Sequence, residues 1–302
     1  MKLLAYLPRH SAGPPESRLG LLGDAGIRDL TAATGAHDVG ELLGYGQSAS
    51  EDLDGDLIDP ETVTLAAPIA RPGKMICVGL NYHDHCREQG IDPPAYPPLF
   101  AKFANAISAP GAAIVRPRVT EQLDMECELA VVIGRRASRI GRQEALDHVF
   151  GYTILNDITM RDLQREDRRW LRAKGSDGFA PIGPVVVTPD ELGDTAALRL
   201  SSTVNGETSQ DSSTAEMVFD VATLIAFASR TITLEPGDII ATGTPAGVGH
   251  FQDPPRYLLH GDRLRCEIQG IGVLENSVED ELPRADDHAM AAGVAELLEL
   301  AR

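Results

Sequence analysis

Short apolar segments, rather than long amphipathic helices, occupy most of the chain from Lys74 to about residue 280. Their length and β-branched content are typical of buried strands. The segments are MICVGL, LFAKF, CELAVVIG, GYTILND, PIGPVVV, LRLSSTVNG, DIIATGT and RLRCEIQGIGVLENSV. Helical patterns occur in QEALDHVF, TMRDLQREDRRWLRAKG and AEMVFDVATLIAFASR. Because the strands do not alternate regularly with helices, the sequence predicts a mixed α/β, β-rich fold and not a doubly wound one.

The first 70 residues have a different pattern and are predicted to form a small N-terminal α+β domain. LLAYL is typical of a strand, and SRLGLLGDAGIRDL of a hairpin whose turn is Gly-Asp-Ala-Gly. AHDVGELLGYG predicts a short helix, and SASEDLDGDLIDPE a surface loop. Pro68 and Pro72 indicate an extended connection to the main domain, 71–302. We expect this domain to end in an amphipathic helical tail from about residue 284.

The charge and cysteine content narrow the functional classes. The chain has 45 acidic and 27 basic side chains and a formal net charge of -18, which disfavours binding to nucleic acids and to anionic membranes. No apolar run approaches the roughly 20 residues of a membrane-spanning helix, and MKLLAYLPRH lacks the pattern of a signal peptide. The four cysteines form no C-x-x-C pair. We therefore expect a cytoplasmic protein without nucleic-acid or membrane partners.

Two glutamates stand one residue apart at the start of the apolar segment DMECELAVVIG. On a strand, Glu126 and Glu128 project to one face, whereas Met125, Cys127 and Leu129 project to the other. Two carboxylates on one face repel each other, and unpaired charge at the edge of a core is unfavourable. A divalent cation would compensate for both effects. An exposed strand face with solvated or arginine-paired glutamates is the alternative.

A third carboxylate, Asp157, ends the apolar segment GYTILND. Acidic residues at the ends of buried strands often belong to functional clefts, although Asp157 could also cap a helix in the following ITMRDLQ. Three carboxylates offer only oxygen ligands, which favours Mg²⁺, Mn²⁺ or Ca²⁺ over Zn²⁺. Such a site would leave coordination positions for water and substrate.

A candidate general base lies in NYHDHCREQG, which predicts a short helix closed by Gly90. Tyr82, His85 and Glu88 would share one side of that helix. A glutamate one turn from a histidine can orient its ring and raise its basicity. The alternative is a surface helix with an ordinary ion pair.

Further polar residues lie in segments with turn signals. Lys174, in LRAKGSDG, could be directed into a cleft or could simply be solvated. Thr242 and Thr244, in ATGTPAGVG, could offer hydroxyl and backbone N–H groups to a carboxylate ligand. An anionic substrate needs a local positive pocket, and one basic stretch could provide it. The alternative is that this stretch forms a solvated helix. Its basic residues are Arg161, Arg165, Arg168, Arg169, Arg172 and Lys174.

Together these segments resemble the fumarylacetoacetate hydrolase superfamily, in its acylpyruvate hydrolase and 2-hydroxyhepta-2,4-diene-1,7-dioate isomerase-like branch. The resemblance covers roughly residues 70–280 and rests on motifs in the family's order. They are KMICVGLNYHDHCRE, PLFAKF, LDMECELAVVIG, GYTILNDITMRDLQ, LRAKGSDGFAPIGP, VNGE and LEPGDIIATGTPAGVG. The resemblance implies a β-roll main domain, a small N-terminal domain and a homodimer.

The resemblance also implies residue roles. It implies metal ligands for Mg²⁺ or Mn²⁺ at Glu126, Glu128 and Asp157. It implies an acid–base dyad of His85 and Glu88 on a lid segment, with Lys174 as a cationic partner. The expected substrate-binding residues are Gln164 and Thr244, at the keto-acid end, together with Tyr82 and Lys102. Phe-Ala-Asn follows Lys102 where many relatives have a proline, so the pocket rim is expected to differ there.

The implied reaction is metal-dependent carbon–carbon hydrolysis of a 2,4-dioxo acid, acylpyruvate- or fumarylpyruvate-like. His85, oriented by Glu88, would activate water, and Lys174 would stabilise charge on the reacting oxygens. An oxaloacetate-type decarboxylase and a hydroxymuconate-type isomerase could use the same residues, since pocket shape separates these reactions. The complete set of candidate residues disfavours a non-catalytic metal-binding protein. No P-loop or dinucleotide fingerprint supports a nucleotide-dependent enzyme.

Overall fold

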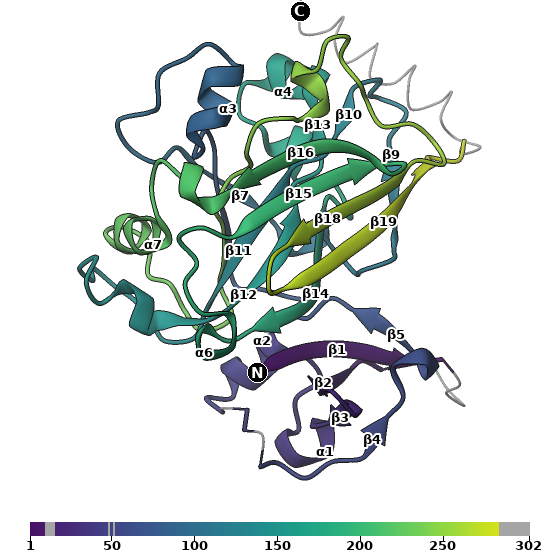
Figure 1. Ribbon diagram of the computed structural model, residues 1–302, viewed down its shortest axis with the longest axis vertical. Coiled ribbons are helices and arrows are strands. Elements are labelled where there is room, and N and C mark those ends of the chain that lie inside the picture. Colours follow the sequence, from purple (N-terminus) through teal and green to yellow (C-terminus); the bar gives the residue numbers. More distant parts are fainter. Residues whose placement is uncertain (10–15, 48, 51, 284–302) are drawn as a thin grey trace, which may run out of the picture.

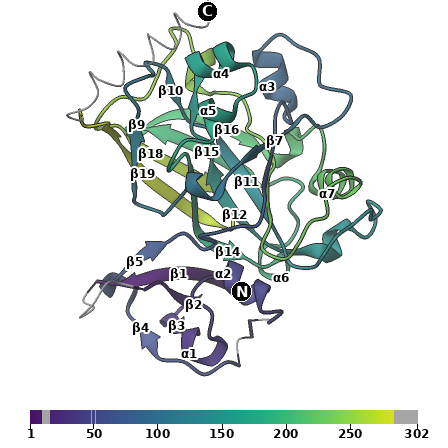
Figure 2. The same cartoon turned by 180° about the vertical axis from the view of Figure 1, so that it is seen from behind.

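The computed structural model describes residues 1–9, 16–47, 49–50 and 52–283, so the predicted C-terminal helical tail lies outside the described residues. The chain folds into two sheets that pack face to face, with short helices around them (Figures 1 and 2). This confirms the mixed α/β, β-rich fold. Among the helices of the described residues, none is long and apolar enough to span a membrane.

The large sheet has twelve strands and contains six of the eight segments predicted as buried strands, whereas LRLSSTVNG and RLRCEIQGIGVLENSV lie in the second sheet. Its main path runs β4 (Leu57–Ile58), β3 (Gly26–Asp29), β2 (Arg18–Gly23), β1 (Lys2–Pro8), β14 (Ala180–Val187), β12 (Val149–Asn156), β11 (Cys127–Ile133), β17 (Ile239–Ala241), β6 (Met75–Val78) and β7 (Leu99–Lys102). Two further strands pair at the side: β5 (Val63–Ala66) with β1, and β8 (Ile107–Ser108) with β14.

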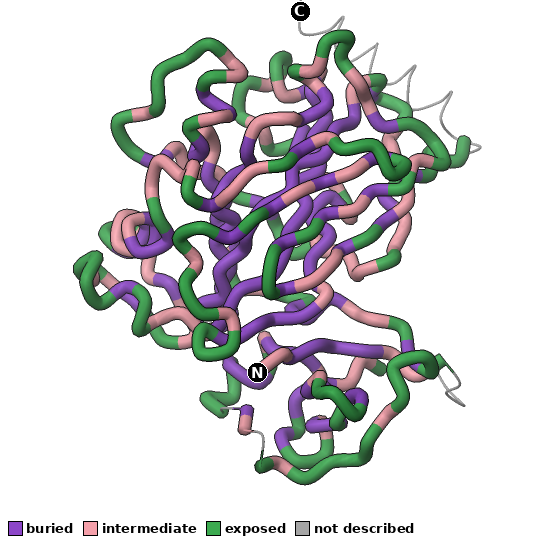
Figure 3. Tube along the Cα trace, viewed as in Figure 1, coloured by how far each residue is buried: buried purple, intermediate pink, exposed green. Residues whose placement is uncertain are grey.

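The second sheet has five strands and covers one face of the first. Its order is β16 (Glu207–Ser213), β15 (Arg199–Val204), β18 (Arg263–Ile268), β19 (Gly272–Asp280) and β9 (Ala113–Arg116). A separate pair consists of β10 (Leu123–Asp124) and β13 (Thr159–Met160). The main core lies between the two sheets, and Figure 3 shows buried residues along the strands of both. The central strand β11 is buried along its whole length, which explains its continuous apolar run.

Helices are short in this fold. The α-helices are α1 (Thr31–Thr34), α2 (Val39–Gly44), α3 (His83–Glu88), α4 (Arg161–Asp167), α5 (Leu171–Lys174), α6 (Pro189–Leu192) and α7 (Val221–Ser229). Single 3₁₀ turns are η1 (Pro60–Thr62), η2 (Ala104–Ala106), η3 (Ala145–His148), η4 (Thr214–Glu216) and η5 (Gly249–Phe251). Helices α3, α4 and α5 lie at the end of the molecule opposite the N-terminal strands (Figures 1 and 2).

Three predicted helices are shorter than their sequence patterns. TMRDLQREDRRWLRAKG forms α4 and α5, because Arg168 and Trp170 adopt left-handed backbone conformations between them. QEALDHVF forms only the 3₁₀ turn η3 before β12 begins. In AEMVFDVATLIAFASR, α7 begins only at Val221, because the Asp220 side chain caps it by accepting from the Thr223 N–H.

The N-terminal strands join the large sheet. β1 pairs with β14 through Lys2 opposite Val187 and Leu3 opposite Val186. The hairpin of β2 and β3 forms as the sequence predicts, and α2 matches the predicted short helix. The division of the chain at residue 70 stays a prediction.

One buried charged group stabilises this N-terminal part. The Asp29 carboxylate accepts hydrogen bonds from the Tyr6 hydroxyl at 2.6 Å, the Thr31 N–H at 2.8 Å and the Arg18 guanidinium. Burial raises the pKa of Asp29, but these hydrogen bonds outweigh burial and hold its pKa below the usual value. The folded protein therefore favours the charged form.

We expect Asp29→Asn to lower the free energy of unfolding by about 1–3 kcal/mol at neutral pH, because buried donors lose a charged acceptor. A lowered folded pKa adds stability above the unfolded pKa, and this stability is lost as pH falls through the folded pKa. Urea unfolding should thus show a smaller difference between wild type and variant in acid. Asp24→Asn, at the exposed hairpin turn, is the matched control and should change stability little. A pH-independent difference would contradict this explanation.

Candidate active site

Three buried carboxylates meet where β11 begins and β12 ends. Glu126 and Glu128 project to one side, while Cys127 packs in the core between the sheets. Asp157 follows β12 directly, and its N–H donates to the Glu126 carbonyl at 2.8 Å. One oxygen from each of the three carboxylates lies within 4.8 Å of the others. Asp157 caps no helix, since the N-cap of α4 is Met160.

The electrostatics of this acidic triad fit a divalent cation. Burial, followed by repulsion from Asp157 and Glu126, raises the pKa of Glu128 well above its usual value. Burial also acts to raise the pKa of Glu126, but the charges of Lys174 and Arg161 outweigh it and lower that pKa to about 2. A cation bound among the three carboxylates would relieve the repulsion on Glu128. The donors are all oxygens, which suits Mg²⁺ or Mn²⁺.

Two lysines contact the triad. The Lys174 ammonium donates to Glu126 Oε2 at 2.9 Å and Asp157 Oδ2 at 2.8 Å. The Lys102 ammonium lies 2.7 Å from Asp157 Oδ1 and also donates to the Phe179 carbonyl at 2.7 Å. Lys174 lines the cavity described below, whereas the fully buried Lys102 lies outside its lining. In this structure Lys102 therefore supports Asp157, and its predicted contact with substrate stays a prediction.

The two residues predicted as an acid–base dyad contact each other on α3. His85 Nδ1 lies 2.8 Å from Glu88 Oε2, and Glu88 Oε1 accepts from the Gly247 N–H at 2.8 Å. With Nδ1–H donated to Glu88, His85 Nε2 is left as a base, and the Gln89 amide contacts it at 2.8 Å. Glu88 thus fixes both the tautomer and the direction of the imidazole. Tyr82 precedes α3, is fully buried and lies outside the cavity lining.

The dyad and the triad share one cavity of about 300 Å³, which is at the lower end of ligand-binding pockets. Its lining includes six residues that the sequence predicted for the site: His85, Glu126, Glu128, Gln164, Lys174 and Thr244. Asp157 and Glu88 are not in the lining, but Asp157 contacts the lining residue Lys174 and Glu88 contacts the lining residue His85. Thr242 is buried outside the cavity lining, and its hydroxyl donates to the Leu129 carbonyl at 2.9 Å. Thr244 donates to the Cys127 carbonyl at 3.0 Å.

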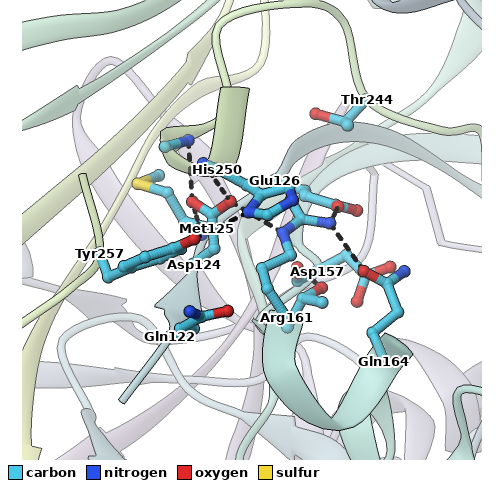
Figure 4. Close-up of polar contacts among 12 residues, drawn as sticks. Gln122, Asp124, Met125, Glu126, Asp157, Arg161, Gln164, Thr244, His250 and Tyr257 are labelled. Carbon is cyan, nitrogen blue, oxygen red and sulfur yellow. Dashed lines mark hydrogen bonds and ion pairs between the residues drawn. The ribbon is translucent and has the colours of Figure 1, made fainter. Parts of the chain in front are cut away.

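Arg161, which the sequence suggested only as one of several basic residues, lies at the centre of the site (Figure 4). The residue is 4% exposed, and its guanidinium contacts Asp124 Oδ2 at 2.9 Å and Glu126 Oε1 at 2.7 Å. Its Nη1 also donates to Gln164 Oε1 at 3.2 Å. Nη2 is buried and has no hydrogen-bond partner among the described residues. An unpaired guanidinium nitrogen in a cavity wall is suited to bind a substrate carboxylate.

The rest of the basic stretch divides between the cavity and the surface. Arg165 lines the cavity, and its Nη2 donates to Gln122 Oε1 at 2.6 Å. Arg172 pairs with Asp167 outside the lining, at 2.6 Å. Arg168 and Arg169 are exposed. The left-handed conformations at Arg168 and Trp170 separate α4 from α5, and both helices contribute lining residues, among them Arg161 and Lys174.

Comparison with known proteins agrees with this geometry. Residues 74–279 match the model of the fumarylacetoacetate (FAA) hydrolase C-terminal family. The mitochondrial oxaloacetate tautomerase FAHD2A of Bos taurus is 42% identical over 290 residues, covering 92% of this chain and 91% of that protein.

Solved structures are similar over nearly the whole chain. A fumarylacetoacetate hydrolase from Exiguobacterium antarcticum aligns with a TM-score of 0.81 and 40% identity, over 92% of this chain and 100% of that chain. Maleylpyruvate hydrolase from Sphingobium sp. SYK-6, solved in complex with manganese(II) and pyruvate, aligns with a TM-score of 0.74 and 31% identity. That alignment covers 93% of this chain and 100% of the other. With its fold, its acidic triad and these relatives, the chain belongs to the fumarylacetoacetate hydrolase family.

Proposed function

We propose that this protein is a metal-dependent enzyme that interconverts the keto and enol forms of a 2-oxo dicarboxylic acid of the oxaloacetate class. The observation that carries the proposal is that His85, with its Nε2 as a base, lines the same cavity as Glu126 and Glu128. Keto–enol exchange needs a group that moves a proton beside a site that stabilises negative charge. The name of the Bos taurus relative, an oxaloacetate tautomerase, supports this reaction.

We propose Mg²⁺ or Mn²⁺ as the cofactor, with Ca²⁺ as a less fitting ion of the same ligand class. Glu126, Glu128 and Asp157 would hold it. The chemistry supplied by such a cation is Lewis-acid stabilisation of the charge that develops on the 2-oxo oxygen. The similar maleylpyruvate hydrolase of Sphingobium, which was solved with manganese(II) and pyruvate, supports both the ion and the 2-oxo acid class.

The protein's own residues would bind the substrate and move the proton. Arg161 Nη2 and the Gln164 amide would bind the carboxylate of the keto-acid end. His85 Nε2 would take a proton from the carbon next to the 2-oxo group and deliver it to the 2-oxo oxygen to give the enol, and the reverse transfer would give the keto form, while Glu88 keeps the imidazole oriented. Substrate would replace the Gln89 amide at Nε2. Lys174 would balance negative charge at the triad.

The test is the rate at which the ultraviolet absorbance of enol-oxaloacetate decays in the presence of Mn²⁺ or Mg²⁺. We expect faster decay with protein than without it, and loss of this acceleration in excess chelator. In D₂O, NMR should show faster deuterium incorporation at carbon 3. Stoichiometric Mn²⁺ binding without turnover of any 2-oxo acid would support the non-catalytic alternative instead.

Carbon–carbon hydrolysis of a 2,4-dioxo acid, which the sequence predicts as the main reaction, is the second candidate. The His85–Glu88 pair favours it, because this pair can activate water as well as accept a proton from carbon. NMR analysis with an acylpyruvate and oxaloacetate separates the reactions. Pyruvate and a new carboxylic acid from the acylpyruvate would establish a hydrolase. Carbon dioxide and pyruvate from oxaloacetate would establish a decarboxylase, and a shifted double bond in a hydroxymuconate-type diacid an isomerase.

Arg161→Lys tests the keto-acid end. Lysine keeps the positive charge beside Asp124 and Glu126 but removes the additional planar donor. We expect kcat/KM to fall by roughly 10- to 100-fold, or about 1.4–2.7 kcal/mol, with Mn²⁺ affinity nearly unchanged. Arg169→Lys, an exposed residue outside the cavity lining, is the matched control. Unchanged kcat/KM in Arg161→Lys would remove this residue from substrate binding.

The assembly and location rest on the sequence. We propose a homodimer, which sedimentation velocity would test, and a small anionic acid as the partner in place of nucleic acid or membrane. We also propose a cytoplasmic location, to be tested by fractionation of the source cells. The word mitochondrial in the name of the Bos taurus relative describes that protein.

A further inference from the structure

The 3₁₀ turn η5 brings a second histidine, His250, into the lining of the cavity (Figure 4). The N–H groups of Gly249 and His250 donate to the two carboxylate oxygens of Asp124, each at 3.0 Å. The same buried carboxylate binds Arg161 Nε at 2.9 Å. A Cβ atom at Gly249 would lie 1.9 Å from the Arg256 carbonyl oxygen, so this close turn requires glycine. Asp124 therefore fixes His250 relative to Arg161.

The ring of His250 is held in one orientation. Its Nδ1 lies 2.9 Å from the Tyr257 hydroxyl. Its ring makes an edge-to-face contact with Phe251, with centroids 4.8 Å apart, and Phe251 makes another with His85 at 5.8 Å. His250 Nε2 has no hydrogen-bond partner among the residues that the structure describes. A fixed polar atom without a partner in a cavity wall is suited to contact a ligand.

The surroundings of His250 contain charges of both signs. Arg161 and Arg165 are its cationic neighbours, and Asp124 and Glu88 are the acidic ones. Burial, followed by the charge of Arg161, lowers the pKa of His250 below its usual value, so the ring is neutral at neutral pH. In the tautomer in which the Tyr257 hydroxyl donates to Nδ1, the neutral ring presents Nε2–H as a donor. Arg165 adds charged N–H donors to the same cavity lining.

We propose that His250 and Arg165 form a subsite for the second, distal carboxylate of the substrate, with Tyr257 fixing the tautomer of His250. The inference rests on the proposed function, in which Arg161, Gln164 and the triad occupy the keto-acid end. Apart from Gln89, which contacts His85, the lining offers His250 and Arg165 as further polar donors. Much of the remaining wall is apolar: Val78, Leu80, Phe100, Trp170 and Phe251. The subsite identifies dicarboxylic 2-oxo acids as the substrate class.

The experiment compares oxaloacetate with its 4-methyl ester, which has the same keto-acid end without the distal charge. His250→Phe keeps a packed ring and removes both nitrogens, and Arg165→Met removes the charge. We expect either variant to reduce kcat/KM for oxaloacetate by roughly 10- to 100-fold, mainly through KM, and for the ester by less than about threefold. Tyr257→Phe should show a smaller loss with the same preference for the ester. Arg169→Met, which removes an exposed charge outside the lining, should leave both rates unchanged.

The possible outcomes separate this inference from the proposed function. Equal losses on both compounds, or no loss on either, would overturn the distal subsite while leaving tautomerisation established. If the wild type converts neither compound, the proposed function fails. The subsite is then tested by the dissociation constants of oxaloacetate and of the ester for the Mn²⁺-loaded protein. Tighter binding of oxaloacetate than of the ester, lost in His250→Phe and Arg165→Met, would support it. Equal binding of the two compounds by the wild type would overturn it.

Discussion

Replacing Glu128 with glutamine will reduce Mn²⁺-dependent turnover by about three orders of magnitude, or about 4 kcal/mol, and will remove tight Mn²⁺ binding. The metal-free variant will nevertheless be at least as stable as the wild type. Burial and the charges of Asp157 and Glu126 disfavour the charged form of Glu128, so a neutral amide relieves an unfavourable interaction. Glutamine also keeps an oxygen that can accept the Gly243 N–H, which Glu128 binds at 2.9 Å.

Thermal unfolding with and without Mn²⁺ measures both effects at once. At Mn²⁺ concentrations about 100-fold above its dissociation constant, the wild type should gain about 2.7 kcal/mol of stability. Glu128→Gln should show almost no gain, whereas its melting temperature in chelator should equal or exceed that of the wild type. Glu166→Gln, an exposed glutamate on α4, is the matched control and should respond to Mn²⁺ like the wild type. A full Mn²⁺ response in Glu128→Gln would show that the cation binds elsewhere.

Replacing His85 with glutamine will lower kcat by roughly 10²- to 10⁴-fold, the range expected when a general base is removed. Mn²⁺ affinity should change little, because His85 contacts Glu88 and Gln89 and is not one of the triad residues. Glu88→Gln should cause a smaller loss, since it removes the charge that orients the imidazole but keeps an acceptor for the Gly247 N–H.

The measurement is deuterium exchange at carbon 3 of oxaloacetate, read by NMR beside a Mn²⁺ titration. His83→Gln changes the same residue type on the same helix, but His83 is exposed, so this control should retain full activity. A wild-type exchange rate in His85→Gln would assign the proton transfer to another group. A parallel loss of Mn²⁺ affinity would instead mean that the substitution disturbs the triad.

Part of the site could be predicted because it depends on local periodicity. Glu126 and Glu128 share a face because strand side chains alternate, and this requires no knowledge of the sheet. Asp157 joins them because Cys127 of β11 pairs with Asn156 of β12. That register joins two segments separated by a loop, so the sequence could place Asp157 at a strand end but could not show its distance from Glu126.

Other features depend on long-range contacts and were missed. Arg161 is distinguished from the neighbouring arginines by its burial beside Asp124. A local sequence pattern cannot predict this burial. The break between α4 and α5 occurs at Arg168 and Trp170, where neither glycine nor asparagine signals a left-handed backbone. The strands were predicted by their apolar content, but not their order. The pairing of β1 with β14 joins segments from opposite parts of the chain, which periodicity cannot reveal.

The three carboxylates of the triad are matched by three cationic side chains in direct contact: Lys102, Lys174 and Arg161. Asp124 also pairs with Arg161, so the cluster carries one formal negative charge before any ion binds. A divalent cation would change this to one positive charge, which an anionic 2-oxo acid would cancel. This balance gives a chain of net charge -18 a local preference for an anionic ligand. Overall acidity and an anionic substrate are thus compatible, because the balance is set within one cavity.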